Sequence, residues 1–212
     1  MIDKKIEHRK ILMVMDGQKA AAVPEPALPE GYKFRFFSGE EDIAHWCRIE
    51  TSVLEFDSEA DARKSFESEF GDDVEQLKKR CIFIVNNENL PIATSMGWFS
   101  KVNFTNRLHW IAVCPKYQGL GLGRAVSQKA VAICAKLSPD NERITWLSTQ
   151  TGSHRAVMIY HKLGFNMTNK PIHAGERNAY IDDFDRAFDV LAKVLKPDEL
   201  ESLKRTALLN EQ

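Results

Sequence analysis

The sequence lacks several features that would assign it to well-known classes of protein. Its 212 residues contain no C-x-x-C pair among the four cysteines, so neither a cysteine metal site nor a disulfide framework is expected. No apolar run reaches the length of a membrane span, and the first ten residues lack the apolar core of a signal peptide. The net charge of −1 gives no electrostatic footprint for nucleic acid. We therefore expect a cytoplasmic protein with free thiols that binds neither nucleic acid nor a membrane.

What the sequence does contain is an ordered series of strand and helix patterns. Three prolines and a glycine within 20–31 predict a linker, and the apolar stretch at 10–16 before it predicts a short strand. Ser38 followed three residues later by Glu41 matches a capping box, which predicts the start of a helix. Hydrophobic spacing predicts helices at 58–70, 74–79 and 153–163, a hairpin of 81–85 with 91–99, and strands at 107–114 and 143–150. This order predicts a mixed sheet with one β-α-β crossover rather than a doubly wound fold.

Three glycines at alternate positions stand out in the stretch CPKYQGLGLGRA at 114–125. Such a loop lets the backbone turn its N–H groups toward a ligand, and the helix that follows adds partial positive charge, so we expect it to bind a phosphate group. No Lys-Ser or Lys-Thr follows the glycines, which excludes a P-loop. The G-x-G-x-G spacing, with no acidic residue at the end of the next predicted strand, does not match a dinucleotide fingerprint either.

The pattern Val113-x-Pro115-x-x-Gln118-x-x-Gly121-x-Gly123 resembles motif A of the GNAT superfamily of acyl-CoA-dependent N-acyltransferases. In that superfamily a loop of the form [Q/R]-x-x-G-x-[G/A] holds the pyrophosphate of coenzyme A. The stretch SHRAVMIYHKLGF at 153–165 resembles the superfamily's later helix motif, N-x-x-A-x-x-x-Y-x-K-x-G-F, with a serine at the position of the usual asparagine. The two stretches have the superfamily's order and separation, with one predicted strand between them.

The resemblance implies an α/β fold of the α+β kind, a mixed and mostly antiparallel central sheet flanked by helices. It places a GNAT-like acetyltransferase domain at 31–180, between an N-terminal extension at 1–30 and a C-terminal helical extension at 181–212. It implies acetyl-CoA as the cofactor and no metal. The residues that it implies for binding acetyl-CoA are Ile111, Ala112, Val113, Gln118, Gly119, Leu120, Gly121, Leu122, Gly123, Arg124 and Ser153.

The resemblance also implies two catalytic residues. Tyr160 matches the position that protonates the departing thiolate, and a phenol with a pKa of about 10 can act as a general acid there. His109 stands where some members that acetylate arylalkylamines carry a histidine, and its pKa of about 6.5 suits a proton relay. For each residue the alternative stays open: a tyrosine ring packed in the core, and a strand histidine bonded to a neighbour or to solvent.

The implied function is the transfer of an acetyl group from acetyl-CoA to a primary amine of a small molecule or a peptide, by direct attack. The alternative is an acyl-CoA-binding sensor that has lost transfer. The predicted first helix and the segment after it border the acceptor site in this superfamily, and their carboxylates are either amine ligands or solvated charges. The residues concerned are Glu50, Glu55 and Asp57, with Trp46, Met96 and Trp98 as lining or core residues. The apolar stripe Phe184, Phe188, Leu191 and Leu195 predicts a last helix, used in the core or in a homodimer contact.

Overall fold

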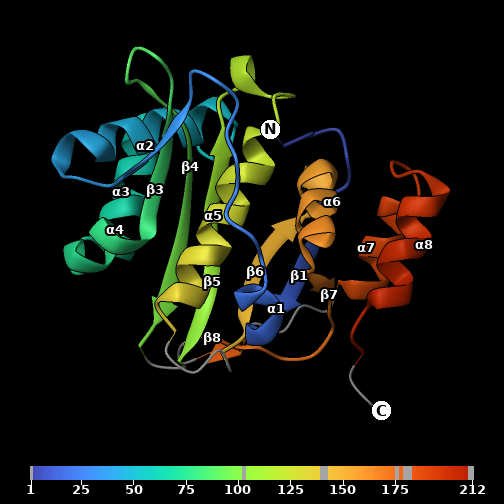
Figure 1. Ribbon diagram of the computed structural model, residues 1–212. Coiled ribbons are helices and arrows are strands. Elements are labelled where there is room, and N and C mark those ends of the chain that lie inside the picture. Colours follow the sequence, from blue (N-terminus) through green and yellow to red (C-terminus); the bar gives the residue numbers. More distant parts are fainter. Residues whose placement is uncertain (1, 102–103, 139–142, 175–176, 179–182, 210–212) are drawn as a thin grey trace. The chain divides into compact units, whose positions relative to one another are not determined.

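The computed structural model describes residues 2–101, 104–138, 143–174, 177–178 and 183–209 (Figure 1). Its main strands are β1 (Lys10–Met15), β2 (Lys33–Phe36), β3 (Cys81–Val85), β4 (Pro91–Ser100), β5 (Thr105–Val113), β6 (Thr145–Gln150) and β7 (Asn166–Met167). Its helices are α1 (Gly17–Ala21), α2 (Glu40–Ser52), α3 (Glu59–Phe70), α4 (Val74–Arg80), α5 (Leu122–Lys136), α6 (His154–Leu163), α7 (Phe184–Leu191) and α8 (Pro197–Thr206).

Within these residues one sheet has seven strands in the order β2-β3-β4-β5-β6-β1-β7. The pairs β2–β3, β3–β4, β1–β6 and β1–β7 are antiparallel, whereas β5 and β6 are parallel. Parallel strands need a crossover connection, and α5 supplies it between β5 and β6. The predicted fold class, a mixed and mostly antiparallel sheet flanked by helices with one β-α-β crossover, is thus confirmed.

The chain divides into two compact units, which are described separately here. Unit 1 comprises Met1–Ile2, Pro24–Trp98 and Leu108–Cys134, and unit 2 comprises Asp3–Val23, Phe99–Arg107 and Ala135–Gln212. Strands β4 and β5 contribute residues to both units.

Unit 1 carries helices on both faces of its strands. Met96 of β4 is fully buried in a hydrophobic cluster with Trp46 of α2 and Phe66 of α3. The next residue, Gly97, faces the opposite side because successive side-chain positions alternate along a strand. A Cβ atom at Gly97 would lie 2.7 Å from the Sγ of Cys134 in α5. Helices α2 and α3 therefore cover one face of β4, and α5 packs closely against the other; Figure 1 shows α2, α3 and α4 gathered beside β3 and β4.

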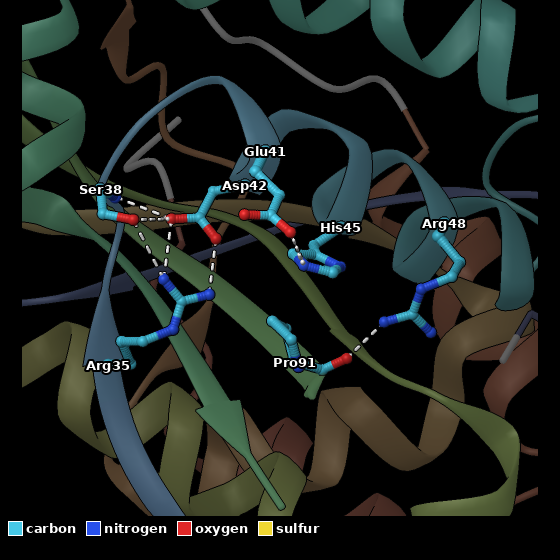
Figure 2. A network of polar contacts seen from close by, with 7 residues as sticks. All are labelled: Arg35, Ser38, Glu41, Asp42, His45, Arg48 and Pro91. Atoms are coloured by element: carbon cyan, nitrogen blue, oxygen red, sulfur yellow. Dashed lines mark hydrogen bonds and ion pairs between the residues drawn. The ribbon is translucent and has the colours of Figure 1, made fainter. Parts of the chain in front are cut away.

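Helix α2 begins one residue later than the predicted capping box (Figure 2). The N-cap is Gly39, and the carboxylate of Asp42 accepts hydrogen bonds from the backbone N–H and the hydroxyl of Ser38, at 2.7 and 2.8 Å. Arg35 of β2 holds the same carboxylate through Nη1–Oδ2 and Nη2–Oδ1 distances of 2.9 and 2.5 Å. The predicted pairing of Ser38 with Glu41 is wrong: Ser38 bonds to Asp42, the first-turn carboxylate that Arg35 also holds.

Unit 2 is built around β1, which confirms the strand predicted at 10–16. β1 pairs with β6 over its full length, from Lys10 opposite Gln150 to Met15 opposite Thr145, and with β7 at Met13 and Val14. Helix α6 ends at Gly164, whose φ of +107° is the left-handed C-cap that favours glycine. The last predicted helix is shorter than its apolar stripe, because α7 ends at Leu191 and leaves Leu195 outside, and a further helix, α8, begins at Pro197.

All four cysteines are buried thiols, and burial raises the pKa of Cys47 to about 11 and that of Cys134 to about 12. Among the described residues no helix has the length and apolar character required to cross a bilayer.

The close approach of β4 to α5 gives a test of the packing in unit 1. We expect Gly97→Ala to lower the free energy of unfolding by about 1–3 kcal/mol, because its Cβ would overlap both the Sγ of Cys134 and the carbonyl oxygen of Ala130, at 2.7 and 2.8 Å. Urea denaturation measures the change. The double variant Gly97→Ala/Cys134→Ala should recover only part of it, because the carbonyl oxygen belongs to the backbone. Unchanged stability of the single variant would contradict this packing.

Candidate active site

The glycine loop lies in unit 1 between β5 and α5, and two of its glycines adopt conformations that other residues avoid. Gly119 and Gly121 have φ values of +83° and +80°, and a Cβ atom built on either would meet no described atom within 4 Å. The N–H of Ala125 donates to the carbonyl of Gly121 at 3.1 Å, which is the first bond of the helix. The N–H groups of residues 122–124 therefore come before Ala125, the first residue whose N–H donates within the helix. The predicted phosphate loop has exposed backbone on an open side and a helix N-terminus directly after it.

The side chain of Gln118 links the loop to the end of β5 through a hydrogen bond. Its Nε2 donates to the carbonyl oxygen of Val113 at 2.9 Å, across the short 3₁₀ turn Pro115–Tyr117. The Gln118 side chain thus supports the loop. Gln118 itself is an exposed residue and comes directly before Gly119. Arg124 is also exposed and lies in the first turn of α5. The structure therefore places all the residues predicted to bind pyrophosphate in one continuous segment of unit 1.

The last residues of β5 show an irregular backbone just before this loop. Trp110 has a φ of +48°, a left-handed conformation that is rare for a bulky residue and costs about 1–3 kcal/mol unless its surroundings enforce it. The segment 111–113 follows, and the N–H of Cys114 then donates to the carbonyl of Ile92 in β4 at 2.9 Å. The regular alternation of side chains along β5 is thus interrupted at Trp110, directly before the backbone of residues 111–113 that is predicted to contact the thioester.

His109 is bonded to a residue that the sequence did not single out. Its Nε2 lies 2.5 Å from Oε1 of Glu69 in α3, and Oε2 of the same carboxylate accepts from Nε1 of Trp110 at 2.9 Å. The side chain of His109 is 10% exposed, and its ring stacks on that of Trp110 with centroids 4.9 Å apart. If His109 is a strand histidine bonded to a neighbour, that neighbour is Glu69. The same hydrogen bond is also compatible with a role of His109 in a proton relay.

Tyr160 and Ser153 belong to unit 2. Tyr160 is buried, and its ring makes an edge contact with Phe165 at a centroid distance of 6.3 Å. Ser153 occupies the N-cap position of α6, yet within the described residues its hydroxyl makes no capping hydrogen bond. The helix starts where the motif predicts it, without the side-chain cap that serine usually provides. The structure therefore places the loop and His109 in one unit and the Tyr160 motif in the other.

Glu50 is the most unusual of the predicted acidic residues. Its side chain lies inside unit 1 with 1% of its surface exposed, and within the described residues its Oε1 has no hydrogen-bond partner. Burial, together with the nearby charge of Glu55, raises the pKa of Glu50 well above its ordinary value. Glu55 itself is exposed. Glu50 is therefore a carboxyl group that favours its neutral form in the folded protein.

The aromatic residues predicted near the acceptor site form part of the core. Trp46 is fully buried and contacts the rings of Phe56 and Trp110 at centroid distances of 5.9 and 5.4 Å, and Trp98 contacts Phe70 at 4.8 Å. Met96 is fully buried in the same cluster. These rings join α2 and α3 to β5 within unit 1, so they support the residues around His109.

Comparisons with known proteins agree with this architecture. The sequence model of the family described as "Acetyltransferase (GNAT) family" matches residues 43–165, more than half of the chain. A GCN5-related N-acetyltransferase from Sphaerobacter thermophilus is similar in fold, with a TM-score of 0.60 and 18% identity over 76% of this chain and 49% of that one. A GCN5-related N-acetyltransferase from Kribbella flavida gives a TM-score of 0.52 and 15% identity over 75% of this chain and 54% of that one.

A GNAT acetyltransferase from Colwellia psychrerythraea gives a TM-score of 0.55 and 10% identity over 78% of this chain and 55% of that one. At these identities the likeness concerns the fold alone. The chain spans about half the length of these solved structures. A search of curated proteins found no match.

The burial of Glu50 predicts a pH-dependent stability that Glu50→Gln should remove. Because the pKa of Glu50 is raised on folding, the folded state holds more protons than the unfolded state at pH values above the ordinary pKa of 4.5. The free energy of unfolding of the wild type should then fall as the pH rises toward the folded-state pKa, by at most about 1.4 kcal/mol per pH unit. Urea denaturation across a pH series measures this.

Glu50→Gln should lack that part of the slope and be the more stable protein at alkaline pH. The control is Glu41→Gln on the same helix, whose side chain is 92% exposed in the wild type and whose replacement should leave the slope as it is. Parallel pH profiles of the wild type and Glu50→Gln would show that Glu50 ionises normally.

Proposed function

Because the chain belongs to the GNAT family of acetyltransferases, we propose that it transfers an acetyl group from acetyl-CoA to a primary amine. The observation that carries this proposal is the loop of residues 118–124, with two glycines at positive φ, an open side and a helix N-terminus. Aligned N–H groups and the helix dipole favour a bound anion. The pyrophosphate of acetyl-CoA is an anion of the size and charge that such a loop accepts.

The donor would be held by backbone and by one cation. The N–H groups of residues 119–124 would bind the pyrophosphate, and the guanidinium of Arg124 would add a charge-assisted hydrogen bond. The backbone of Ile111–Val113 would hold the pantetheine arm, with an N–H near Val113 available to donate to the thioester carbonyl. A donor at that oxygen stabilises the negative charge that develops as the amine attacks. The support for this arrangement is that the loop is bonded directly to Val113 through Gln118.

The chemistry then needs three proton transfers. An ammonium acceptor first loses a proton to His109, directly or through water, so that its nitrogen lone pair can attack the thioester carbon. A C–N bond forms, the C–S bond breaks, and the sulfur leaves with its electron pair, while the nitrogen loses its second proton to solvent and becomes the neutral amide nitrogen. Tyr160 donates its phenolic proton to that thiolate, and the proton taken by His109 is returned through solvent to restore the phenol. The products are the amide and free CoA.

A second function, an acyl-CoA-binding sensor without transfer, has one observation in its favour. Ser153 replaces the asparagine usual in the motif, and its hydroxyl makes no capping bond within the described residues. The glycine loop would serve such a sensor equally well. Binding of acetyl-CoA without CoA release in the presence of any amine would select this alternative.

Donor binding is tested by thermal shift and by titration calorimetry. We expect acetyl-CoA and CoA to raise the melting temperature, and NAD and ATP to leave it unchanged, since ligands that bind only the folded state stabilise it. Arg124→Gln should raise the Kd for acetyl-CoA about tenfold, the effect of losing one charge-assisted hydrogen bond. Lys136→Gln, which removes the same charge at the other end of α5, is the matched control. A wild type that binds neither CoA species would overturn the proposal.

The role of Tyr160 is tested by Tyr160→Phe, which keeps the buried ring and removes only the hydroxyl. We expect kcat to fall on the order of 100-fold, because the departing thiolate loses its general acid, while the Kd for acetyl-CoA stays the same. Thiol release from acetyl-CoA over a panel of amines measures kcat. Tyr32→Phe, a change of the same chemistry in unit 1, should have no effect. Equal turnover of Tyr160→Phe and the wild type would leave Tyr160 as a core residue.

A further inference from the structure

One carboxylate in unit 1 binds two consecutive residues of β5. Oε1 of Glu69 lies 2.5 Å from Nε2 of His109, and Oε2 lies 2.9 Å from Nε1 of Trp110. Phe70, the next residue of α3, makes an edge contact with the His109 ring at 5.9 Å. The last turn of α3 is thus attached to β5 at one point by both polar and aromatic contacts. We call this arrangement of Glu69, His109 and Trp110 the β5 clamp.

A regular strand would not allow the β5 clamp, because neighbouring side chains of a strand point to opposite faces. His109 and Trp110 nevertheless stack with an interplanar angle of 29°, so both rings lie on the same side. The φ of +48° at Trp110 makes this possible by turning the backbone at that residue. A non-glycine residue holds such a conformation only when its surroundings enforce it. The two hydrogen bonds to Glu69 hold it from α3, and ring contacts of Trp46 and Phe56 with Trp110 add to them.

Glu69 occupies a position in its own helix that is electrostatically unfavourable for a carboxylate. It lies in the last turn of α3, where the partial negative charge of the helix C-terminus disfavours a carboxylate. The two hydrogen bonds across to β5 offset that unfavourable placement, since hydrogen bonds to a charged group are stronger than those between neutral groups. The carboxylate is therefore held by tertiary contacts rather than by helix preference.

The bonding also fixes the histidine ring. The indole Nε1–H of Trp110 can only donate, and an ionised carboxylate can only accept. Glu69 accepting from both rings therefore requires a proton on Nε2 of His109. A glutamine amide has one acceptor oxygen, so it can accept a hydrogen bond from only one of the two rings. The other ring then faces the amide N–H group and loses its bond, unless His109 moves its proton to Nδ1.

We propose that Glu69 is a positioning residue for acetyl transfer, which holds the turned backbone at Trp110 through the β5 clamp and so sets where the backbone of Ile111–Val113 meets the thioester. This inference rests on the proposed function and deepens it. Residues 111–113 follow the turn directly, so a relaxed turn would displace the donor N–H near Val113. A displacement of about 1 Å at a reacting group lowers rates on the order of 100-fold.

The test compares Glu69→Gln with Glu67→Gln. Both change one carboxylate to an amide near the end of α3, but Glu67 binds only the surface residue Arg63 among the contacts described, at 3.2 Å. We expect Glu69→Gln to lower kcat on the order of 100-fold with a change in the Kd of acetyl-CoA of less than about threefold, because the pyrophosphate loop is untouched. Glu67→Gln should match the wild type in both constants.

A spectroscopic measurement separates positioning from a general loss of structure. In protein labelled with ¹⁵N-histidine, two-bond ¹H–¹⁵N correlation spectra should show His109 protonated at Nε2 in the wild type and a changed His109 signal in Glu69→Gln, with His109→Gln assigning the signal. Trp110→Phe, which keeps the ring and removes one of the two donors, is the second variant and should lower kcat in the same direction.

Wild-type turnover in folded Glu69→Gln and Trp110→Phe would overturn the inference and leave the proposed function standing. The same holds if His109 of the wild type is protonated at Nδ1. A wild-type protein that neither binds acetyl-CoA nor transfers its acetyl group would instead overturn the proposed function, and the inference with it.

Discussion

The end of β5 has to satisfy two opposed demands, and the surrounding structure follows from them. Its backbone must be fixed in place, and yet the segment after it must offer unpaired N–H groups to a ligand. Gln118 meets the first demand by bonding to Val113, and the positive φ values of Gly119 and Gly121 meet the second. No described atom lies within 4 Å of a Cβ built on either glycine, so the anion site that we propose would consist of backbone N–H groups and the N-terminus of α5.

Those features could be predicted from the sequence because each is local. Glycine at a positive φ is a property of one residue, so the loop and the C-cap at Gly164 follow from residue type and spacing. The fold class follows likewise from the order of strand and helix patterns. The start of α2 was predicted one residue out of place, because Arg35, seven residues before Asp42, competes for the first turn. Glu69 could not be predicted, since its two bonds cross 40 and 41 residues of sequence.

Helix α2 shows how tertiary contacts give two carboxyl groups opposite character. Burial would raise the pKa of Asp42, but the hydrogen bonds from Arg35 and Ser38 outweigh it and hold that pKa below its ordinary value. Glu50 lies two turns further along the same helix; among the described residues its buried Oε1 has no hydrogen-bond partner, and its pKa is raised. Asp42 thus remains a charged anchor that joins α2 to β2, whereas Glu50 favours a neutral carboxyl group within the core of unit 1.

The donor and the acceptor of the proposed reaction therefore depend on different parts of the sequence. In the proposed reaction the acetyl-CoA site would use backbone groups, which tolerate a change such as serine for asparagine at Ser153 better than a site built from side chains would. The acceptor would be distinguished by side chains, and in unit 1 the candidates are carried by α2 and α3, which present Glu50 and Glu69 toward the aromatic core and β5. On this proposal, substitutions in α2 and α3 would change the acceptor while the loop after β5 keeps the same donor.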